Sequence, residues 1–329
     1  MSNYDISIER VLLRKQNSIY RIERGGYMLF YLVKLLVAFG GGVFAASIGP
    51  MYTFILVGVV ATAGSLVTCA GIAGANELLV SNLAFGPFLA PCVAFQSGVA
   101  ASAYARKKGY TENGQDIGTA LFGLGRPDVL LVGGIFGVIG FIVCDIVNYI
   151  FSLTPFYTDN VALTIIILAV VVRLIFGERG MLSAPDKKSY FSKGRVLGNT
   201  LVVGIGYSLA VSGVYVFLAM QGYAEQLSAY HFLIFGLCGV GLIFAAMGQS
   251  FYGWHHIGLI AAEAVMCGWS IGLGPVGALL FGTGFGLIST MLGDFCTCLM
   301  NTDVDSHIDS PSFAIFICTF IISVVYALA

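Results

Sequence analysis

The sequence predicts an all-α integral membrane protein with roughly 9–10 hydrophobic helical segments, each of about 20 residues where it crosses the bilayer fully. Hydrophobic residues make up 58% of the chain and charged residues only 10%, whereas soluble domains carry about 25% charged residues. The mean hydropathy is +0.90. A membrane β-barrel would show short segments of alternating hydrophobicity, and the long apolar runs do not have that pattern.

The first segment, residues 1–26, is polar and basic, with Arg10, Arg14, Lys15, Arg21 and Arg24. It lacks the short apolar run and small-residue cleavage site of a signal peptide. We therefore expect a cytoplasmic N-terminal arm that lies on the membrane surface as an amphipathic helix. The protein is expected to be a multi-pass protein of the cell membrane with its N-terminus in the cytoplasm.

Basic residues predict the topology of the first half. Apart from Lys34 and Arg173, every Lys and Arg falls in the arm, in 106–126 or in 179–195, and all three clusters should face the cytoplasm. The chain between two clusters must then cross the membrane an even number of times. Spans at about 128–151 and 161–177, each near the length that crosses a bilayer, satisfy this for the second interval.

The interval 27–105 is harder to fit. Spans at about 28–48 and 51–73 form one pair, and the remaining residues 76–104 are too few for two further crossings. Gly86, Pro87 and Pro91 interrupt a helix there. The sequence therefore predicts a re-entrant pair of short helices that turns near Gly86-Pro87 and is buried in protein or lines an aqueous cavity. A single span is the alternative, and it would place the cluster from Arg106 outside.

Beyond Arg195 the chain contains no Lys or Arg, so charge does not orient the spans expected at about 199–220, 231–250, 257–273, 276–293 and 312–329. A two-fold internal repeat is predicted instead. Gly86-Pro87 and Gly274-Pro275 each open an apolar, small-residue helix, and a polar loop follows with Asp116 or His307. The repeat is parallel if 294–311 is cytoplasmic, and an inverted arrangement is equally compatible with the charges.

These patterns divide the chain into four parts. They are the arm 1–26, a first membrane repeat 27–152, connecting helices 153–230 with a basic cytoplasmic loop 178–198, and a second membrane repeat 231–329. Small-residue spacings favour close helix contacts, and we expect a homo-oligomer.

Ionisable residues inside a bilayer cost about 2.5–3.5 kcal/mol and are therefore candidates for function. Glu77 begins the first broken segment, and Glu263 is the most deeply placed acid. Each is expected to bind a cation or a proton, or else to stabilise a helix dipole or to remain a protonated carboxyl between helices. His255 and His256 form an aromatic-histidine belt or contact the substrate. The predicted solute pathway comprises Asn76, Glu77, Gly86, Pro87, Pro91, Gln96, His255, His256, Glu263, Gly274 and Pro275.

Asp294, Cys296, Cys298 and His307 are weak candidates for a metal site. A closed zinc site needs four ligands, and two alternate cysteines without a second pair do not supply them. A solvated acidic loop is the simpler interpretation, so no metal and no cofactor are predicted.

The function these features favour is a membrane transporter or channel that moves a small polar or ionic solute through a site formed by the broken helices of two repeats. The expected partners are that solute and the lipid bilayer, and no nucleic acid. A non-catalytic membrane subunit or scaffold is the alternative. An intramembrane enzyme is disfavoured because no His-Glu-x-x-His motif occurs, and no P-loop for ATP is present.

Overall fold

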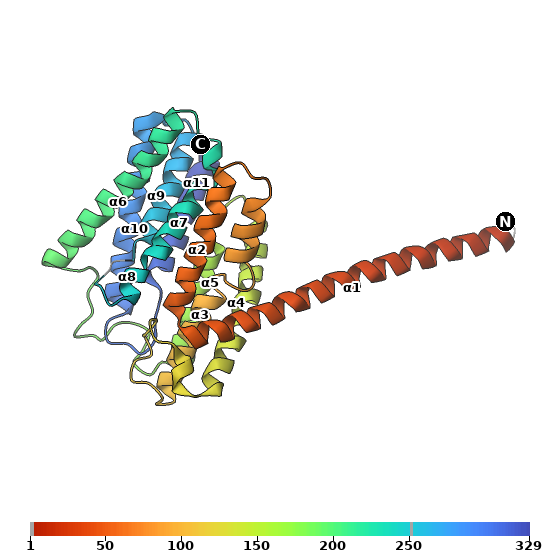
Figure 1. Cartoon of the computed structure of the whole chain (residues 1–329), viewed down its shortest axis with the longest axis horizontal. Coiled ribbons are helices and arrows are strands. Elements are labelled where there is room, and N and C mark those ends of the chain that lie inside the picture. Colours follow the sequence, from red (N-terminus) through yellow and green to blue (C-terminus); the bar gives the residue numbers. More distant parts are fainter. Residues whose placement is uncertain (1–2, 251–252) are drawn as a thin grey trace.

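The computed structural model describes residues 3–250 and 253–329, with side chains from Gly26 onward. Every regular element in that part of the chain is a helix (Figure 1). In order they are α1 (Asn3–Ile48), α2 (Pro50–Cys69), the π-helix η1 (Asn76–Ala84), α3 (Ala94–Lys107), the 3₁₀ turn η2 (Leu121–Leu124), α4 (Pro127–Ser152), α5 (Asn160–Phe176), α6 (Gly194–Met220), the 3₁₀ turn η3 (Gln226–Ala229), α7 (Tyr230–Gly241), α8 (Ile243–Ala246), α9 (His255–Ser270), α10 (Gly274–Met300) and α11 (Ser310–Leu328).

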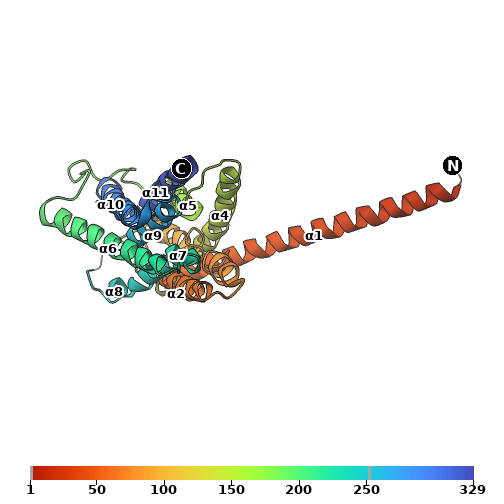
Figure 2. The same ribbon diagram turned by 90° about the horizontal axis from the view of Figure 1, so that it is seen from above.

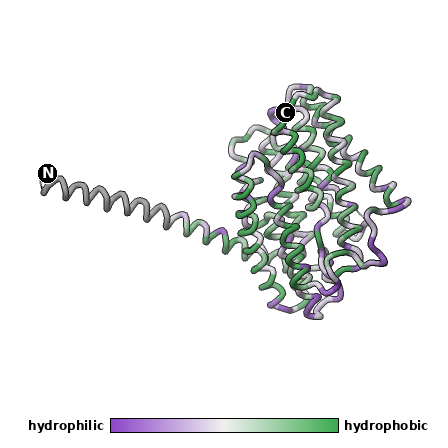
Figure 3. Tube along the Cα trace, turned by 180° about the vertical axis from the view of Figure 1, so that it is seen from behind, coloured by the Kyte–Doolittle hydropathy of each residue, from purple (hydrophilic) through white to green (hydrophobic). Residues whose placement is uncertain are grey.

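Seven described segments are long and apolar enough to cross a membrane, which confirms a multi-pass helical membrane protein. They are Gly26–Ile48, Pro50–Cys69, Pro127–Ser152, Gly194–Met220, Gln226–Ala246, Gly274–Met300 and Ser310–Leu328. The helices α5 and α9 are shorter, with 17 and 16 residues. Hydrophobic residues cover most of the bundle, and hydrophilic residues gather at its ends (Figure 3).

The loops 108–126, 177–193 and 301–309 meet at one end of the bundle, which we call the basic end (Figure 1). Contacts tie them together there: Arg106 pairs with Glu178 at 2.8 Å, and Gln115 donates to the carbonyl of Asn301 at 3.1 Å. The connections 70–75, 153–159, 221–229 and 271–273 join helices toward the other end, called the opposite end.

The segment 76–107 differs from the predicted re-entrant hairpin. Gly64, in the C-terminal half of α2, packs against Leu79 of η1, while Pro50, at the start of α2, packs against Gly98 of α3. η1 and α3 therefore follow each other antiparallel to α2, from the opposite end to the basic end. The irregular stretch 85–93, which contains Pro87, follows the end of η1. The helix α3 then begins and runs in the same direction as η1. This path through the bundle matches the alternative of a single, broken segment rather than a hairpin.

The helix α1 projects from the bundle before it reaches α2 (Figures 1 and 2). Three segments that could each cross the membrane once lie between the arm and the loop 108–126: α1, α2 and the pair η1–α3. The arm and that loop can share one side of the membrane only if α1 lies along the surface. The side chains of residues 1–25 are outside the described part, so the cytoplasmic arm stays a prediction.

Small residues bring the long helices into backbone contact. Gly42 of α1 faces Gly133 of α4, and a Cβ on Gly42 would overlap the Gly133 carbonyl oxygen. Likewise, a Cβ on Gly286 of α10 would overlap the Ser208 hydroxyl of α6. Membrane helices associate through such small-residue faces because lipid removes the hydrophobic drive between helices. Between the pairs α1–α4 and α6–α10 lie the mostly buried helices α3 and α9, with α2 and α7 on one side and α5 and α11 on the other (Figure 2).

Candidate functional site: a row of cavities through the bundle

A first cavity of about 310 Å³ opens near the basic end, and we call it the basic-end cavity. It lies between the starts of α2, α3, α9 and α11 and the loop before α11. His255, His307 and Asp309 are its titratable lining residues. The remaining walls are largely apolar and include Phe54 and Phe95.

Two further cavities, of about 380 and 350 Å³, lie toward the opposite end. They share Tyr157, His231 and Glu263 as lining residues, so together we call them the Glu263 cavities. The larger also contains Asp159 and Thr319. Each volume is within the range of small-ligand sites, about 300–1,000 Å³.

A small space of about 20 Å³, which we call the junction, separates these cavities. It shares Phe54 and His255 with the basic-end cavity, and Phe85, Asp159 and Val161 with the larger Glu263 cavity. A space of this size holds about one water molecule. The cavities therefore form a row through the bundle with a constriction in the middle.

Aromatic rings form the constriction. The centroids of Phe54 and Phe235 lie 5.4 Å apart, and those of Phe85 and Phe235 lie 5.5 Å apart. His255 completes the group, with its centroid 4.8 Å from that of Phe54. Edge-to-face and tilted pairs at these separations are favourable, so the closed junction is a stable arrangement of the helices.

Two aspartates cap the helices that start inside the bundle. The Asp159 carboxylate accepts from the backbone N–H of Ala162 at 2.8 Å, and the Asp309 carboxylate accepts from that of Ser312 at 2.9 Å. The backbone angles agree, with φ −73° and ψ 99° for Asp159 and φ −72° and ψ 100° for Asp309. A carboxylate at this position satisfies free N–H groups and compensates the positive end of the helix dipole.

The start of α5 lies deep in the bundle. The Thr158 hydroxyl donates to the carbonyl of Phe316, in the second turn of α11, at 2.7 Å. The loop 153–159 therefore reaches inward from the opposite end, and Asp159 lines both the junction and the larger Glu263 cavity. At the basic end, Asp309 lines the basic-end cavity.

The lining of the row is acidic. Its titratable side chains, within the described residues, include no Lys or Arg; they are Asp159, Glu263, Asp309, His231, His255 and His307, with Tyr157, Tyr215, Tyr326 and Cys267 in the Glu263 cavities. The Glu263 carboxylate accepts a hydrogen bond from the Thr319 hydroxyl at 2.7 Å. Negative lining groups favour positive or neutral solutes over anions.

The structure brings only some predicted pathway residues to this row. Pro91 lines the junction, His255 the junction and the basic-end cavity, and Glu263 the two cavities named after it. His256 is buried beside Gly293 of α10. Gln96 is fully buried, with neither amide atom hydrogen-bonded, and lines none of the four cavities.

The other predicted pathway residues lie elsewhere. Asn76 and Glu77 belong to η1, away from the four cavities, and the Glu77 side chain is exposed. Gly86 and Pro87 lie in the break between η1 and α3, outside the cavity linings.

Gly274 and Pro275 form the exposed first turn of α10 at the opposite end. A proline is tolerated in the first turn because its missing N–H would be unpaired anyway. Gly274-Pro275 therefore opens an apolar helix, as the sequence predicts, but it does not interrupt a helix inside the bundle and lines none of the four cavities.

The weak metal candidates have separate partners. Asp294 accepts from the backbone N–H of Ser192 at 2.8 Å and from its hydroxyl at 2.5 Å. Cys296 is buried in an apolar cluster, while Cys298 lies 3.6 Å from the Ser192 hydroxyl. His307 is 3.4 Å from Asp309. Among the described residues, no three His, Cys, Asp or Glu side chains stand together as metal ligands.

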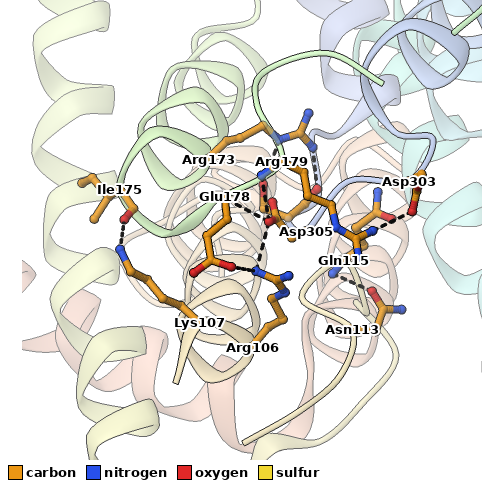
Figure 4. Close-up of polar contacts among 11 residues, drawn as sticks. Arg106, Lys107, Asn113, Gln115, Arg173, Ile175, Glu178, Arg179, Asp303 and Asp305 are labelled. Atoms are coloured by element: carbon orange, nitrogen blue, oxygen red, sulfur yellow. Dashed lines mark hydrogen bonds and ion pairs between the residues drawn. The ribbon is translucent and has the colours of Figure 1, made fainter. Parts of the chain in front are cut away.

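A polar network closes the basic end beside the first cavity (Figure 4). Arg106 lies between Glu178 and Asp305, at 2.8 and 3.0 Å. Arg179 pairs with Asp303 at 2.6 Å, and Lys187 with the same carboxylate at 3.2 Å. These contacts join the last turn of α3 and the loop after α5 to the loop before α11.

Arg173 anchors the same network from inside. Its side chain is buried, and its guanidinium donates to the carbonyls of Met181, Met300 and Ser306 and to the Ser306 hydroxyl. An arginine near the end of an apolar helix ordinarily extends its guanidinium to the membrane surface. The observed role differs because loop carbonyls fold over the end of α5 and replace water as acceptors.

Sequence reasoning missed Asp159, His231, Phe54 and Phe235. A usable signal existed for the first: Thr158-Asp159-Asn160 and Ile308-Asp309-Ser310 both place an aspartate within a few residues of the start of a predicted span. That is the pattern of a helix N-cap. No local pattern marks the phenylalanines, since one aromatic on an apolar helix resembles many others.

Comparison with known proteins gives one match, to the family of unknown function DUF7973, whose model covers residues 26–188 and 206–329. No curated protein and no solved structure matches the chain. The matched residues include nearly all of the helical bundle and every residue that lines the row of cavities. The chain therefore belongs to the DUF7973 family.

Proposed function

We propose that this protein is a membrane transporter that moves a small polar solute, neutral or positively charged, along the row of cavities. The observation that carries the proposal is the junction, which shares lining residues with a large cavity on each side. A site that only binds a ligand needs a single opening to solvent. A row that runs between the two ends of a membrane bundle provides a path across it.

The junction favours a transporter over an open channel. Its volume of about 20 Å³ admits a water molecule and nothing larger. A solute that fills one of the large cavities can pass only if Phe54 and Phe235 separate. Such a change, coupled to closure of the other side, is alternating access.

We also propose an inverted internal repeat, with units of about 26–176 and 194–328, because α1–α5 and α6–α11 correspond in order and packing. The long helices α1 and α6 pack against α4 and α10. The short helices α3 and α9 pack against those same partners, and α2 packs against α7. These units replace the predicted boundaries 27–152 and 231–329 as the proposed repeats.

A shared sequence motif supports this pairing. Residues 133–145 of α4 and 282–294 of α10 both read Gly-x-x-Phe-Gly-x-Ile-x₅-Asp. The motif runs from the basic end in α4 and toward it in α10. Similarly, Phe54 precedes Gly58 in α2 by the spacing at which Phe235 precedes Gly239 in α7.

The capped helices give matching contacts. Asn160, the first residue of α5, donates to Asn148 of α4 at 2.5 Å. Ser310, the first residue of α11, accepts from Thr297 of α10 at 2.8 Å. Asn148 and Thr297 both lie three residues beyond the aspartate that ends the shared motif. Two units of opposite orientation place one large cavity toward each end of the bundle, and the junction lies between them.

The aspartate caps bear on the charge of the solute. Half-helix N-termini with free N–H groups attract anions. Here Asp159 and Asp309 occupy those positions. The row therefore favours a neutral or cationic solute over an anion.

Blocking the path tests the proposal. Val161 lines the junction and the larger Glu263 cavity. Val161→Cys is made in a background where the half-buried Cys69 and Cys298, and Cys267 of the smaller Glu263 cavity, are serine, because the other native cysteines are buried and line none of the four cavities. Purified protein is reconstituted, and uptake of urea, glycerol, sodium, potassium and methylammonium is measured before and after a charged methanethiosulfonate reagent.

We expect uptake of at least one probe, its loss after modification, and recovery with a reducing agent. Tyr223→Cys is the matched control, since that exposed loop residue should react without loss of uptake. Uptake that persists in fully modified Val161→Cys would place the path elsewhere. Absence of protein-dependent uptake for every probe would contradict the transporter proposal.

A further inference from the structure

Glu263 differs from the other acids of the row in its surroundings. Asp159 and Asp309 are engaged by the backbone N–H groups of the helices that they cap. The Glu263 carboxylate has a single hydrogen bond described for it, from the Thr319 hydroxyl, and it borders open space in both Glu263 cavities. It is therefore the acid whose oxygens remain available to a proton or a ligand.

The neighbours of Glu263 come from every element around that side of α9. α6 contributes Tyr215, α7 His231, and α11 Tyr326 and Cys318, while Tyr157 and Asp159 belong to the loop before α5. α10 packs against the other side of α9, at Ala261 and Val265. No lysine or arginine is among these neighbours within the described residues, so the ionised carboxylate has no permanent counter-charge there.

Tyr157 lies close enough to the Glu263 carboxylate to be affected by its charge. Burial and the Glu263 carboxylate together raise the pKa of the Tyr157 phenol to about 12. A charge that acts on a neighbouring loop residue also acts on a cation in the shared cavities.

The two units of the proposed repeat differ at the position of Glu263. When Gly98 of α3 is aligned with Gly258 of α9, Glu263 corresponds to Ala103. Only one of the two units therefore carries a carboxyl at this position. Packing alone does not require the acid, since an alanine fills the matching place between α3 and its neighbours.

We infer that Glu263 is the proton-carrying group of the transporter: its carboxylate takes up one proton from the Glu263 cavities and releases it during the transport cycle. This inference rests on the proposed function. Protonation converts the carboxylate to a neutral carboxyl, so the charge of the site changes by one, and movement of solute can be linked to movement of a proton.

Proton binding is measurable without knowledge of the solute. Proteoliposomes are adsorbed to a solid-supported membrane, and a step in pH is applied in a buffer without other solutes. We expect a transient current for the wild-type protein and for Glu263→Asp, which keeps a carboxyl. We expect its loss in Glu263→Gln, which keeps the shape and an oxygen that can accept from Thr319.

Glu77→Gln is the matched control, because Glu77 is an exposed acid of η1 that lines none of the four cavities. It should keep the wild-type current. An unchanged current in correctly folded Glu263→Gln, judged by size-exclusion profile and by labelling of Val161→Cys, would overturn the inference. That result would leave the transporter proposal intact if modification at Val161 still blocks solute uptake.

Discussion

The ring of Phe54 on α2 meets the ring of Phe235 on α7 at an interplanar angle of 64°, with centroids 5.4 Å apart. The two helices touch directly behind these rings, where a Cβ on Gly58 would come within 2.8 Å of the Gly236 carbonyl oxygen. The aromatic pair therefore closes the junction at the point where the two proposed repeats meet.

Removing both rings should open the junction. We expect the double variant Phe54→Ala, Phe235→Ala to raise the rate at which a membrane-impermeant thiol reagent, added at the basic end, labels Val161→Cys. A tenfold increase corresponds to a barrier lowered by about 1.4 kcal/mol. Phe217→Ala is the control, because Phe217 of α6 is 63% exposed. Equal labelling rates in both variants would show that the rings do not limit access.

The glycine contacts predict a matched pair of stability effects. Gly42→Ala should lower the melting temperature in detergent because its Cβ overlaps the Gly133 carbonyl oxygen, and overpacking costs about 1–3 kcal/mol. Gly40→Ala should be neutral or stabilising, since its Cβ meets open space and alanine favours a helix by about 1 kcal/mol. Gly286→Ala and Gly284→Ala should behave in the same way in α10. Equal melting temperatures within each pair would contradict the observed packing.

Arg173 should be more important for stability than any exposed arginine. Arg173→Met leaves the carbonyls of Met181, Met300 and Ser306 without their donor, and each unpaired buried acceptor costs about 1–3 kcal/mol. We expect a lower melting temperature and faster proteolysis within 177–193. Arg195→Gln, at an exposed position, should change neither. A wild-type proteolysis rate in Arg173→Met would show that these bonds do not hold the loop.

The ion pairs of Asp303 lead us to expect that the stability of the fold falls at low pH. The hydrogen bond from Lys187, and then the charges of Lys187 and Arg179, hold the pKa of Asp303 below its ordinary value of 3.8. A group with a lowered folded-state pKa stabilises the fold above its unfolded pKa, and that stability is lost as pH falls through the lowered value.

Melting temperatures between pH 7 and pH 3 test this. Asp303→Asn should reduce the melting temperature at pH 7 and flatten its fall below about pH 4, the ordinary range of an aspartate. Asp186→Asn, which changes another acid of the basic end, should follow the wild-type curve. A wild-type pH profile in Asp303→Asn would show that the ion pairs of Asp303 do not contribute to stability.

Much of this fold follows from the sequence because hydropathy decides which segments enter a bilayer. The helices from α4 to α6 begin and end within a few residues of the predicted spans. The path of 76–107 could not be predicted in the same way. Prolines such as Pro87 and Pro91 mark where a helix stops, but the direction of the next helix depends on its partner, here Pro50 of α2 packed on Gly98.

The candidate site was predicted in part for a similar reason. Glu263 and His255 are conspicuous because ionisable side chains are rare in apolar helices. Gly274-Pro275 opens a helix as the sequence predicts, but that helix start is exposed at the opposite end and lines none of the four cavities. Asp159 lies in what resembles an ordinary loop, and its depth is set by the contact of Thr158 with α11, which involves residues far apart in sequence.

The distribution of basic residues has a consequence for biogenesis. The loops up to Arg195 carry the Lys and Arg residues that orient helices during insertion, and the chain after Arg195 has none. The helices α7–α11 must therefore acquire their orientation from the helices already inserted, through contacts such as α7 on α2 and α11 on α5. Synthesised alone, residues 221–329, which contain α7–α11, should enter the membrane in both orientations, so that the first half acts as an internal assembly template for the second.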